Sequence, residues 1–140
     1  MAIVPPLEAL RAALLADPLL AVAVGEHVYV DVVPARATPS LEAEAGVMLR
    51  HAGGPGAARH AALLAVRVDV HAFGATPYAA MLAHYAAHDA LRRVERLTIA
   101  GTLIHSVLPE AGPMSVTNPT TEYPEVVSTW ALLTAEEVPA

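Results

Sequence analysis

The segment LLAVRVDVHAFGATPYAAMLAHYAAHDALRRV, residues 63–94, joins a strand pattern directly to a helix pattern and decides the fold. Along residues 63–73, apolar side chains alternate with the polar side chains of Arg67, Asp69 and His71. This two-residue period predicts a strand with one buried face and one polar face. His71 is therefore expected to point outward and to face solvent or a neighbour.

The helix pattern that follows begins with a strong start signal. Thr76 can serve as the N-cap, and Pro77 suits the first helical position because its missing N–H has no partner there. Helical periodicity continues to about Val94 or Arg96. We therefore expect one long helix directly after the strand.

This helix carries apolar residues on two sides, whereas an ordinary surface helix has one apolar stripe. The first side can lie close on a sheet because its residues are mostly small: Ala80, Ala83, Ala87, Ala90, Leu91 and Val94. The second side is bulkier and consists of Tyr78, Met81, Leu82 and Tyr85. We expect it to meet either Leu10 and Leu14 of the same chain or an adjacent subunit.

The part of the chain before this segment predicts a helix and two strands. Residues 5–15 carry two prolines at their start and a leucine stripe at helical spacing, and Asp17-Pro18 ends this helix. Residues 19–24 are a short apolar piece closed by Gly25. The strands expected on this side span residues 27–33 and 46–51.

The part of the chain after this segment predicts two more strands, at residues 98–107 and 125–134. We expect loops at residues 34–40, 53–59 and 109–124, the last two mobile in a free subunit, and a frayed end at residues 135–140. This order of elements predicts an α+β fold: a single domain over residues 1–140, with a mostly antiparallel mixed β-sheet and helices packed on one side.

Composition excludes several classes of function. The 140 residues include no cysteine, which rules out disulfides, cysteine-ligated zinc, iron–sulfur clusters and cysteine nucleophiles. The net charge of −6 is opposite to that of proteins that grip a nucleic-acid backbone. No apolar run reaches the roughly 18 residues of a membrane span, and the N-terminus lacks the basic region of a signal peptide. We expect a soluble protein without membrane contact.

Histidine is the residue type that invites a metal hypothesis. His84 and His88 are four residues apart on one side of the long helix, a spacing that can hold a metal ion. However, Tyr85 stands where an HExxH motif has glutamate, and the sequence places no third ligand. A solvated or interface role is therefore favoured. Structural roles are also favoured for His27, His51, His60 and His105.

No other catalytic motif is present. None of the four serines lies in a GxSxG elbow, and the glycine-rich stretch at residues 53–56 lacks the GK[ST] ending of a phosphate loop. Arg92, Arg93 and Arg96 form the one basic cluster, at the end of the long helix, where cations complement the helix dipole. We expect no enzymatic activity, no catalytic residue, no cofactor and no metal.

Three stretches together resemble a known family. They are LEALRAALLADPLLAVAVGEHVYV (residues 7–30), LLAVRVDVHAFGATPYAAMLAHYAAHDAL (residues 63–91) and EYPEVVSTWALLTAEE (residues 122–137). In this order they resemble the tail terminator, or tail completion, proteins of long-tailed bacteriophages. The resemblance implies a homohexameric ring that caps the head-proximal end of the tail tube and stops tube polymerisation. It also implies a position in the virion, at the head–tail junction, after assembly in the host cytoplasm.

The resemblance further implies three partners: the tail tube protein, a head-side connector or stopper protein, and DNA that passes through the ring only as cargo. A ring needs two different contact patches on each subunit. Tyr78, Met81, Leu82 and Tyr85 are candidates for one patch, because aromatic residues and methionine are enriched in interface cores. Two alternatives stay open: another phage head–tail joining or minor tail protein, and a small metal-dependent or ligand-binding domain that uses His84 and His88.

Overall fold

In the residues that it describes, a computed structural model shows one seven-stranded sheet and three helices. It describes residues 5–31, 45–53, 56–57, 63–99, 101–117 and 123–136. The elements follow in the order α1 (Pro6–Leu15), α2 (Pro18–Val24), β1 (Val28–Val30), β2 (Gly46–His51), β3 (Gly56–Ala57), β4 (Leu63–Phe73), α3 (Pro77–Arg93), β5 (Glu95–Ile99), β6 (Thr102–Thr117) and β7 (Pro124–Glu136).

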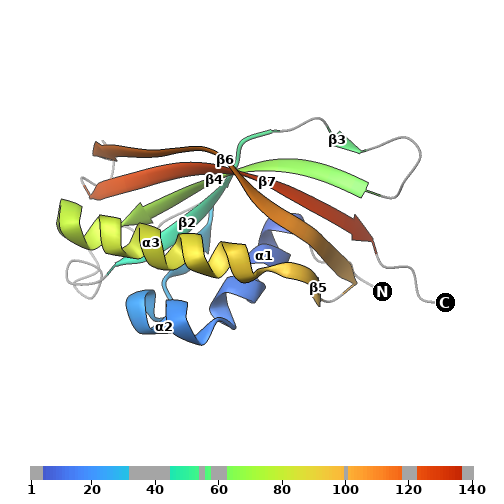
Figure 1. Cartoon of the computed structure of the whole chain (residues 1–140), viewed down its shortest axis with the longest axis horizontal. Helices are drawn as coiled ribbons and strands as arrows, with labels where there is room; N and C mark the ends of the chain where they lie inside the picture. The colour runs from blue at the N-terminus through green and yellow to red at the C-terminus, as the bar shows by residue number, and fades with distance from the viewer. Residues whose placement is uncertain are drawn as a thin grey trace.

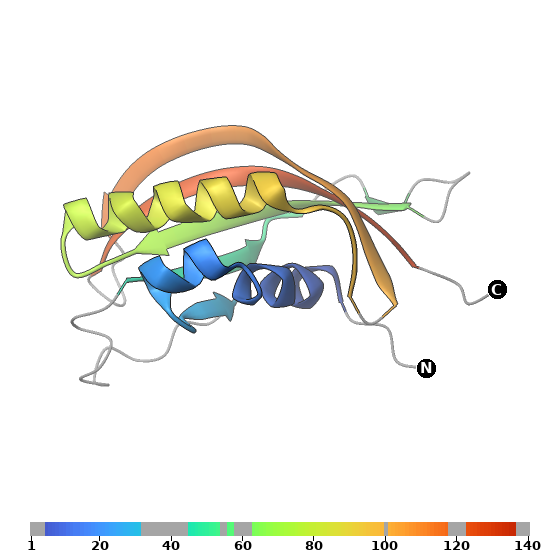
Figure 2. The same ribbon diagram turned by 60° about the horizontal axis from the view of Figure 1, so that its bottom comes forward.

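The sheet is mixed but mostly antiparallel, as the sequence predicts. Its strand order is β1-β2-β4-β7-β6-β5, and the short β3 also pairs with β4. The β1–β2 pair is parallel, and every other pair of described strands is antiparallel. All three helices lie on one side of the sheet (Figure 1). The long strands β6 and β7 bend around α3 on that side (Figure 2). The predicted α+β class is therefore confirmed.

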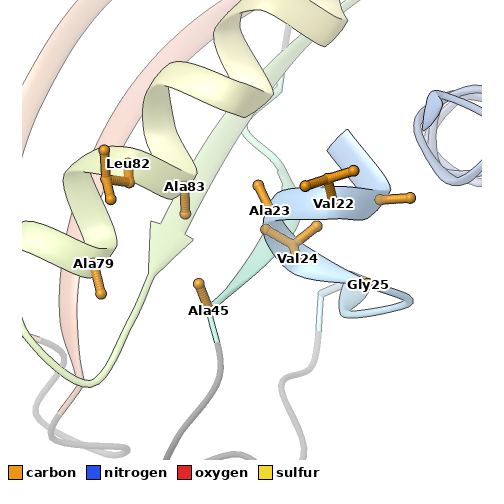
Figure 3. Close-up of a pocket in the computed structure, with 9 residues that line it drawn as sticks. Val22, Ala23, Val24, Gly25, Ala45, Ala79, Leu82 and Ala83 are labelled. Carbon is orange, nitrogen blue, oxygen red and sulfur yellow. The ribbon is translucent and has the colours of Figure 1, made fainter. Parts of the chain in front are cut away.

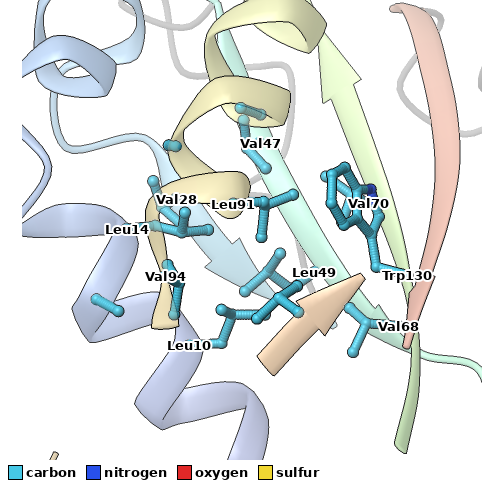
Figure 4. Close-up of a cluster of buried hydrophobic side chains, with 14 of the residues drawn as sticks. Leu10, Leu14, Val28, Val47, Leu49, Val68, Val70, Leu91, Val94 and Trp130 are labelled. Atoms are coloured by element: carbon cyan, nitrogen blue, oxygen red, sulfur yellow. The ribbon is translucent and has the colours of Figure 1, made fainter. Parts of the chain in front are cut away.

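The main core fills the space between the helices and the concave face of the sheet. The predicted alternation in β4 is confirmed, because Val66, Val68 and Val70 are buried towards the helices. The predicted small-residue side of α3 lies on the sheet, and all six of its members are buried. Figure 4 shows Leu91 of α3 among core side chains contributed by α1, β2 and β7.

A smaller apolar cluster lies on the other face of the sheet and consists of Met48, Phe73 and Tyr123. His71 is on this face, and its Nδ1 lies 3.2 Å from Oε1 of the buried Glu125. The side chain of His71 is only 15% exposed. His71 thus lies on the outward face of β4, as its alternation predicts, and the neighbour that it meets there is Glu125 of β7.

The piece at residues 19–24 is part of a helix, α2, which the sequence analysis missed. Asp17 is its N-cap, since Oδ1 of Asp17 accepts hydrogen bonds of 3.0 Å from the backbone N–H groups of Leu19 and Leu20. Pro18 occupies the first helical turn. Asp17 Oδ2 also lies 2.8 Å from Nε of Arg93, which ties the start of α2 to the end of α3.

The region after α3 differs most from expectation. Instead of one strand at residues 98–107 and a loop at residues 109–124, the chain forms a hairpin of β5 and a 16-residue β6. Gly101, with φ of 87°, lies in the turn. Pro109 and Pro113 fit within β6 because β5 pairs with β6 only as far as Ser106, and an edge strand needs no N–H on its free side.

Bulges adapt β6 to its curved course. The pairing with β7 shifts register between Pro109 and Ala111 and again between Ala111 and Met114. Gly112 lies within the second shift with φ of 102°, and a Cβ there would stand 2.8 Å from the carbonyl oxygen of Val127. A glycine is therefore required at this point, and a sequence that looks like a turn continues the strand.

Three other predictions need adjustment. The loop expected at residues 53–59 contains the two-residue strand β3, and β1 is shorter than the predicted 27–33. At the C-terminal end, β7 reaches Glu136, past the expected start of fraying. Residues 34–40, 118–122 and 137–140 lie outside the described part of the chain.

Candidate subunit interface

The start of α3 is fixed by local contacts that also orient its outer side. Thr76 Oγ1 accepts a 3.1 Å hydrogen bond from the backbone N–H of Ala79, and Pro77 occupies the first turn. Gly74 lets this turn approach closely, since a Cβ there would be 2.7 Å from the Cβ of Ala79. The helix therefore leaves β4 with its alanines towards the sheet and its bulky side chains away from it.

The bulky side of α3 is not covered by the rest of the described chain. Tyr78 is 74% exposed, Tyr85 59% and Leu82 49%, while Met81 is half-buried at the flank. The two tyrosines alone present on the order of 250 Å² of surface, because an aromatic side chain can bury roughly 150–250 Å². Leu10 and Leu14 of the same chain are themselves buried in the core and leave Tyr78, Leu82 and Tyr85 largely exposed.

A groove separates this side of α3 from α2. It has a volume of about 520 Å³, and its lining residues include Val22, Ala45 and Leu82. Figure 3 shows Leu82 and Ala83 of α3 facing the Val22–Val24 segment of α2, with Ala45 between the two helices. The groove is apolar and contains no charged side chain among its lining residues.

The second wall of the groove adds apolar surface that the sequence analysis did not identify. In α2, Val22 is 87% exposed and Leu19 is 64% exposed. We call the large exposed apolar side chains of α2 and α3 the helical surface; it consists of Leu19, Val22, Tyr78, Leu82 and Tyr85. Of these, Val22 and Leu82 line the groove. Large exposed apolar patches on a soluble chain mark sites of interaction. The signal that could have revealed this wall was the N-cap dipeptide Asp17-Pro18, which starts a helix as well as ending one.

His84 is buried on the sheet side of α3, whereas the side chain of His88 is 34% exposed. His84 is 4% exposed, its ring lies 6.0 Å from that of His88, and the ring of His88 packs edge-on at 5.1 Å from that of Trp130. A hollow of about 190 Å³ separates them from Glu110 and the neighbouring part of β6. The expectation of a solvated or interface histidine is therefore wrong for His84.

Burial, with a smaller contribution from the nearby His88, lowers the pKa of His84 below its ordinary value. The imidazole of His84 is therefore neutral near pH 7, as suits a buried side chain. Within the described ranges, no group of three or more histidine, aspartate, glutamate or cysteine side chains is placed to hold a metal ion. The described geometry thus supplies two nitrogen ligands at most, not a built metal centre.

The basic end of α3 has a structural use. Arg92 and Arg93 lie in its last turn, where cations complement the helix dipole. Arg93 donates hydrogen bonds of 2.8 and 3.0 Å to the two carboxylate oxygens of Asp17. The hydrogen bond from Arg93 is the largest cause that lowers the pKa of Asp17.

No helix in the described part of the chain is both long and apolar enough to cross a membrane.

Comparison with known proteins finds a likeness among solved structures. No protein-family model matches the sequence, and no curated protein sequence matches it. Among solved structures, the chain is similar to a chain in "Virion of native gene transfer agent (GTA) particle", with 17% identity and a TM-score of 0.66. The match covers 95% of this chain and 99% of that chain. At this identity the likeness is one of fold: over nearly its whole length, the protein folds like a chain of that virion particle.

Proposed function

We propose that the protein is a structural component of a phage-like virion and acts there as a tail terminator. In this role a ring of subunits, six by resemblance to the family, caps the head-proximal end of the tail tube and stops tube polymerisation. The ring then joins the tube to a head-side connector or stopper protein. The observation that carries the proposal is the fold shared with a virion chain over 95% of the sequence.

The surface of the subunit supports an assembly role. Five large apolar side chains of the helical surface lie in water in the single chain, which is unfavourable unless another protein covers them. A subunit that works inside a ring has such a surface covered by its neighbour. Tyr78, Leu82 and Tyr85 supply the aromatic and aliphatic side chains that are typical of interface cores.

The candidate reactive side chains of the described part have structural partners. Ser128 accepts a 2.9 Å hydrogen bond from the Trp130 indole, His71 pairs with Glu125, and His84 is buried against the sheet. We therefore propose a role without catalysis. The net charge of −6 suits a lumen through which DNA slides, because a negatively charged wall does not bind phosphates.

Polymerisation of the tail tube protein tests this function directly. Added in substoichiometric amounts, the purified protein should shorten the tubes, and electron microscopy should find it as a ring at one tube end. Tubes of unchanged length, with the protein absent from their ends, would contradict the proposal. The Y85E variant is the matched control, because it changes one exposed side chain and should not arrest growth.

A second candidate role is supported by the same shared fold: another head–tail joining or minor tail protein. The two roles differ in where the protein lies and in how many copies a particle holds. Labelling the protein in intact particles separates them. Six copies at the junction between tail tube and head support the terminator, whereas copies distributed along the tail, or inside the head, support the alternative.

A further inference from the structure

A second exposed apolar surface lies on β6. All residues from Leu108 to Thr117 are exposed, and three of them are large apolar side chains: Leu108 (59%), Met114 (60%) and Val116 (37%). We call these three residues the β6 surface. Beyond Ser106 this edge of the sheet has no partner strand among the described residues. As with the helical surface, nothing in the described part of the chain covers it.

The register of the sheet places the β6 surface on the side away from the helices. Met114 pairs with Val127, which in turn pairs with His71 of β4. Leu108 pairs with Ala131, which pairs with Arg67. Residues paired across antiparallel strands share a face, and Arg67 and His71 alternate with the valines that face the core. The β6 surface and the helical surface therefore lie on opposite sides of the subunit, across the layers seen in Figure 2.

We propose that the β6 surface of one subunit docks on the helical surface of the next copy of the same chain. This inference rests on the ring assembly proposed above and names the contact that builds it. Two surfaces on opposite sides of one subunit cannot cover each other within that subunit. They can do so head-to-tail between copies, and such a contact closes into a ring when successive rotations sum to a full turn.

Both surfaces are apolar, and the helical surface is large enough to form part of a specific interface. A specific interface buries about 800 Å² on each partner, and the tyrosines of the helical surface alone supply about a third of that. The eight residues that define the two surfaces are all uncharged. The groove of about 520 Å³ between α2 and α3 gives an unbranched side chain such as Met114 a place to enter.

A second copy also explains both surfaces at once. In a head-to-tail ring each subunit offers one of each, so neither is left in water. A symmetric contact between two helical surfaces would leave the β6 surface exposed. Extension of the sheet across the free edge of β6 is disfavoured, because Pro109, Pro113 and the register shifts interrupt its hydrogen-bonding pattern. We therefore expect contact through side chains.

Disulfide cross-linking tests this contact, and the absence of native cysteine makes the test clean. Variants Y85C and M114C are mixed in equal amounts and oxidised mildly. We expect at least tenfold more cross-linked dimer in the mixture than in either variant alone. The double variant Y85C/M114C should give a ladder of covalent oligomers that ends at the size of the ring. The control pair is L97C, on β5, with Y85C, and it should cross-link no better than chance.

Light scattering of the wild-type protein, alone and with tube protein, separates the two possible failures. If wild-type protein forms a ring but the mixture of variants gives no cross-link, the docking contact is rejected and the terminator role stands. The same holds if Y85C alone gives the strongest cross-link. If wild-type protein remains monomeric in both conditions and no cross-link forms, the contact and the ring are both rejected. Both sites are exposed in the subunit, so neither cysteine is expected to disturb folding.

Discussion

The two sides of α3 reverse the usual distribution of side-chain size. The side that packs on the sheet consists mainly of alanines, whereas the side that faces away carries Tyr78, Leu82 and Tyr85. In an ordinary amphipathic helix the large apolar residues are the buried ones. Here the sheet supplies the bulk of the core, including Trp130 and Leu49, and the alanines let the helix approach closely.

This difference underlies our proposal that folding and assembly use opposite sides of one helix. Burial of the alanine side stabilises the single chain, since those residues leave water when the subunit folds. The tyrosine side stays in water in the single chain and gains burial only when a partner covers it. Substitutions on the two sides should therefore change different measurements.

The largest difference is expected for one substitution made on each side. Leu91 is fully buried, so Leu91→Ala should lower the free energy of unfolding by about 2–5 kcal/mol. Leu82 is half-exposed, so Leu82→Ala should lower it by less than about 1 kcal/mol. Urea unfolding of the monomeric protein measures both. Equal losses in the two variants would show that the two sides do not differ in this way.

A smaller effect is expected when a side chain is enlarged. Ala87 lies against the sheet with 1% exposure, so Ala87→Leu should cost about 1–3 kcal/mol through overpacking. Asp89→Leu adds a side chain of the same size at an exposed position of the same helix and serves as the control, with an expected change within about 0.5 kcal/mol. If thermal melts show that Ala87→Leu is as stable as wild type, the close approach of α3 to the sheet is not a constraint.

Asp17 links the two properties, because it caps α2, the other wall of the groove. Asp17→Ala should lower stability by about 1–2 kcal/mol through loss of the cap, and should also weaken assembly. Arg93→Met is the matched variant, because it removes the ion pair and keeps the cap. It should therefore cost less stability than Asp17→Ala, and calorimetry of the two variants would contradict this account if the order were reversed.

The same residue gives a dependence on pH at the acid end. Arg93 holds the pKa of Asp17 below its ordinary value of 3.8. The ionised carboxylate is therefore favoured in the folded chain, so its contribution is present above pH 3.8 and is lost as the pH falls through the lowered pKa. In the Arg93→Met variant, the free energy of unfolding should change less with pH in this window than it does in wild type. An unchanged slope would argue against the pairing.

The smallest effect is expected at His84, on the buried side of α3. Burial lowers the pKa of His84 below 6.5 in the folded chain. Between that pKa and 6.5 the unfolded chain binds a proton that the folded chain does not, so stability falls as the pH is lowered through this window. His84→Asn should show a shallower fall in urea unfolding than wild type, whereas a fall of equal slope would exclude His84 as its source.

Much of the fold could be predicted because local signals and tertiary contacts agree in the middle of the chain. The predicted range of β4 matches the structure from Leu63 to Phe73, and α3 begins at the predicted Pro77. At both places the period of apolar residues coincides with a clear boundary residue. The alanine side of α3 was likewise predicted, because size and spacing alone indicate close packing on a sheet.

The remaining elements depend on information that lies outside the local sequence. Prolines suggested a loop after Pro109, yet this stretch belongs to an edge strand, where a missing N–H carries no cost. The seven-residue α2 is too short for periodicity to separate helix from strand. Two of the five residues of the helical surface were missed for the same reason, since Leu19 and Val22 belong to it only once α2 is placed beside α3.

The most direct test of the central claim measures mass and stability of Tyr85→Glu beside wild type. Light scattering with tube protein present should find wild type in rings and the variant as a monomer, because assembly would bury an unpaired carboxylate. Thermal melts of the two monomers should agree within about one or two degrees, since Tyr85 is 59% exposed in the subunit. A variant that still forms rings, or one whose monomer melts several degrees lower, would contradict the assignment of this side of α3 to assembly.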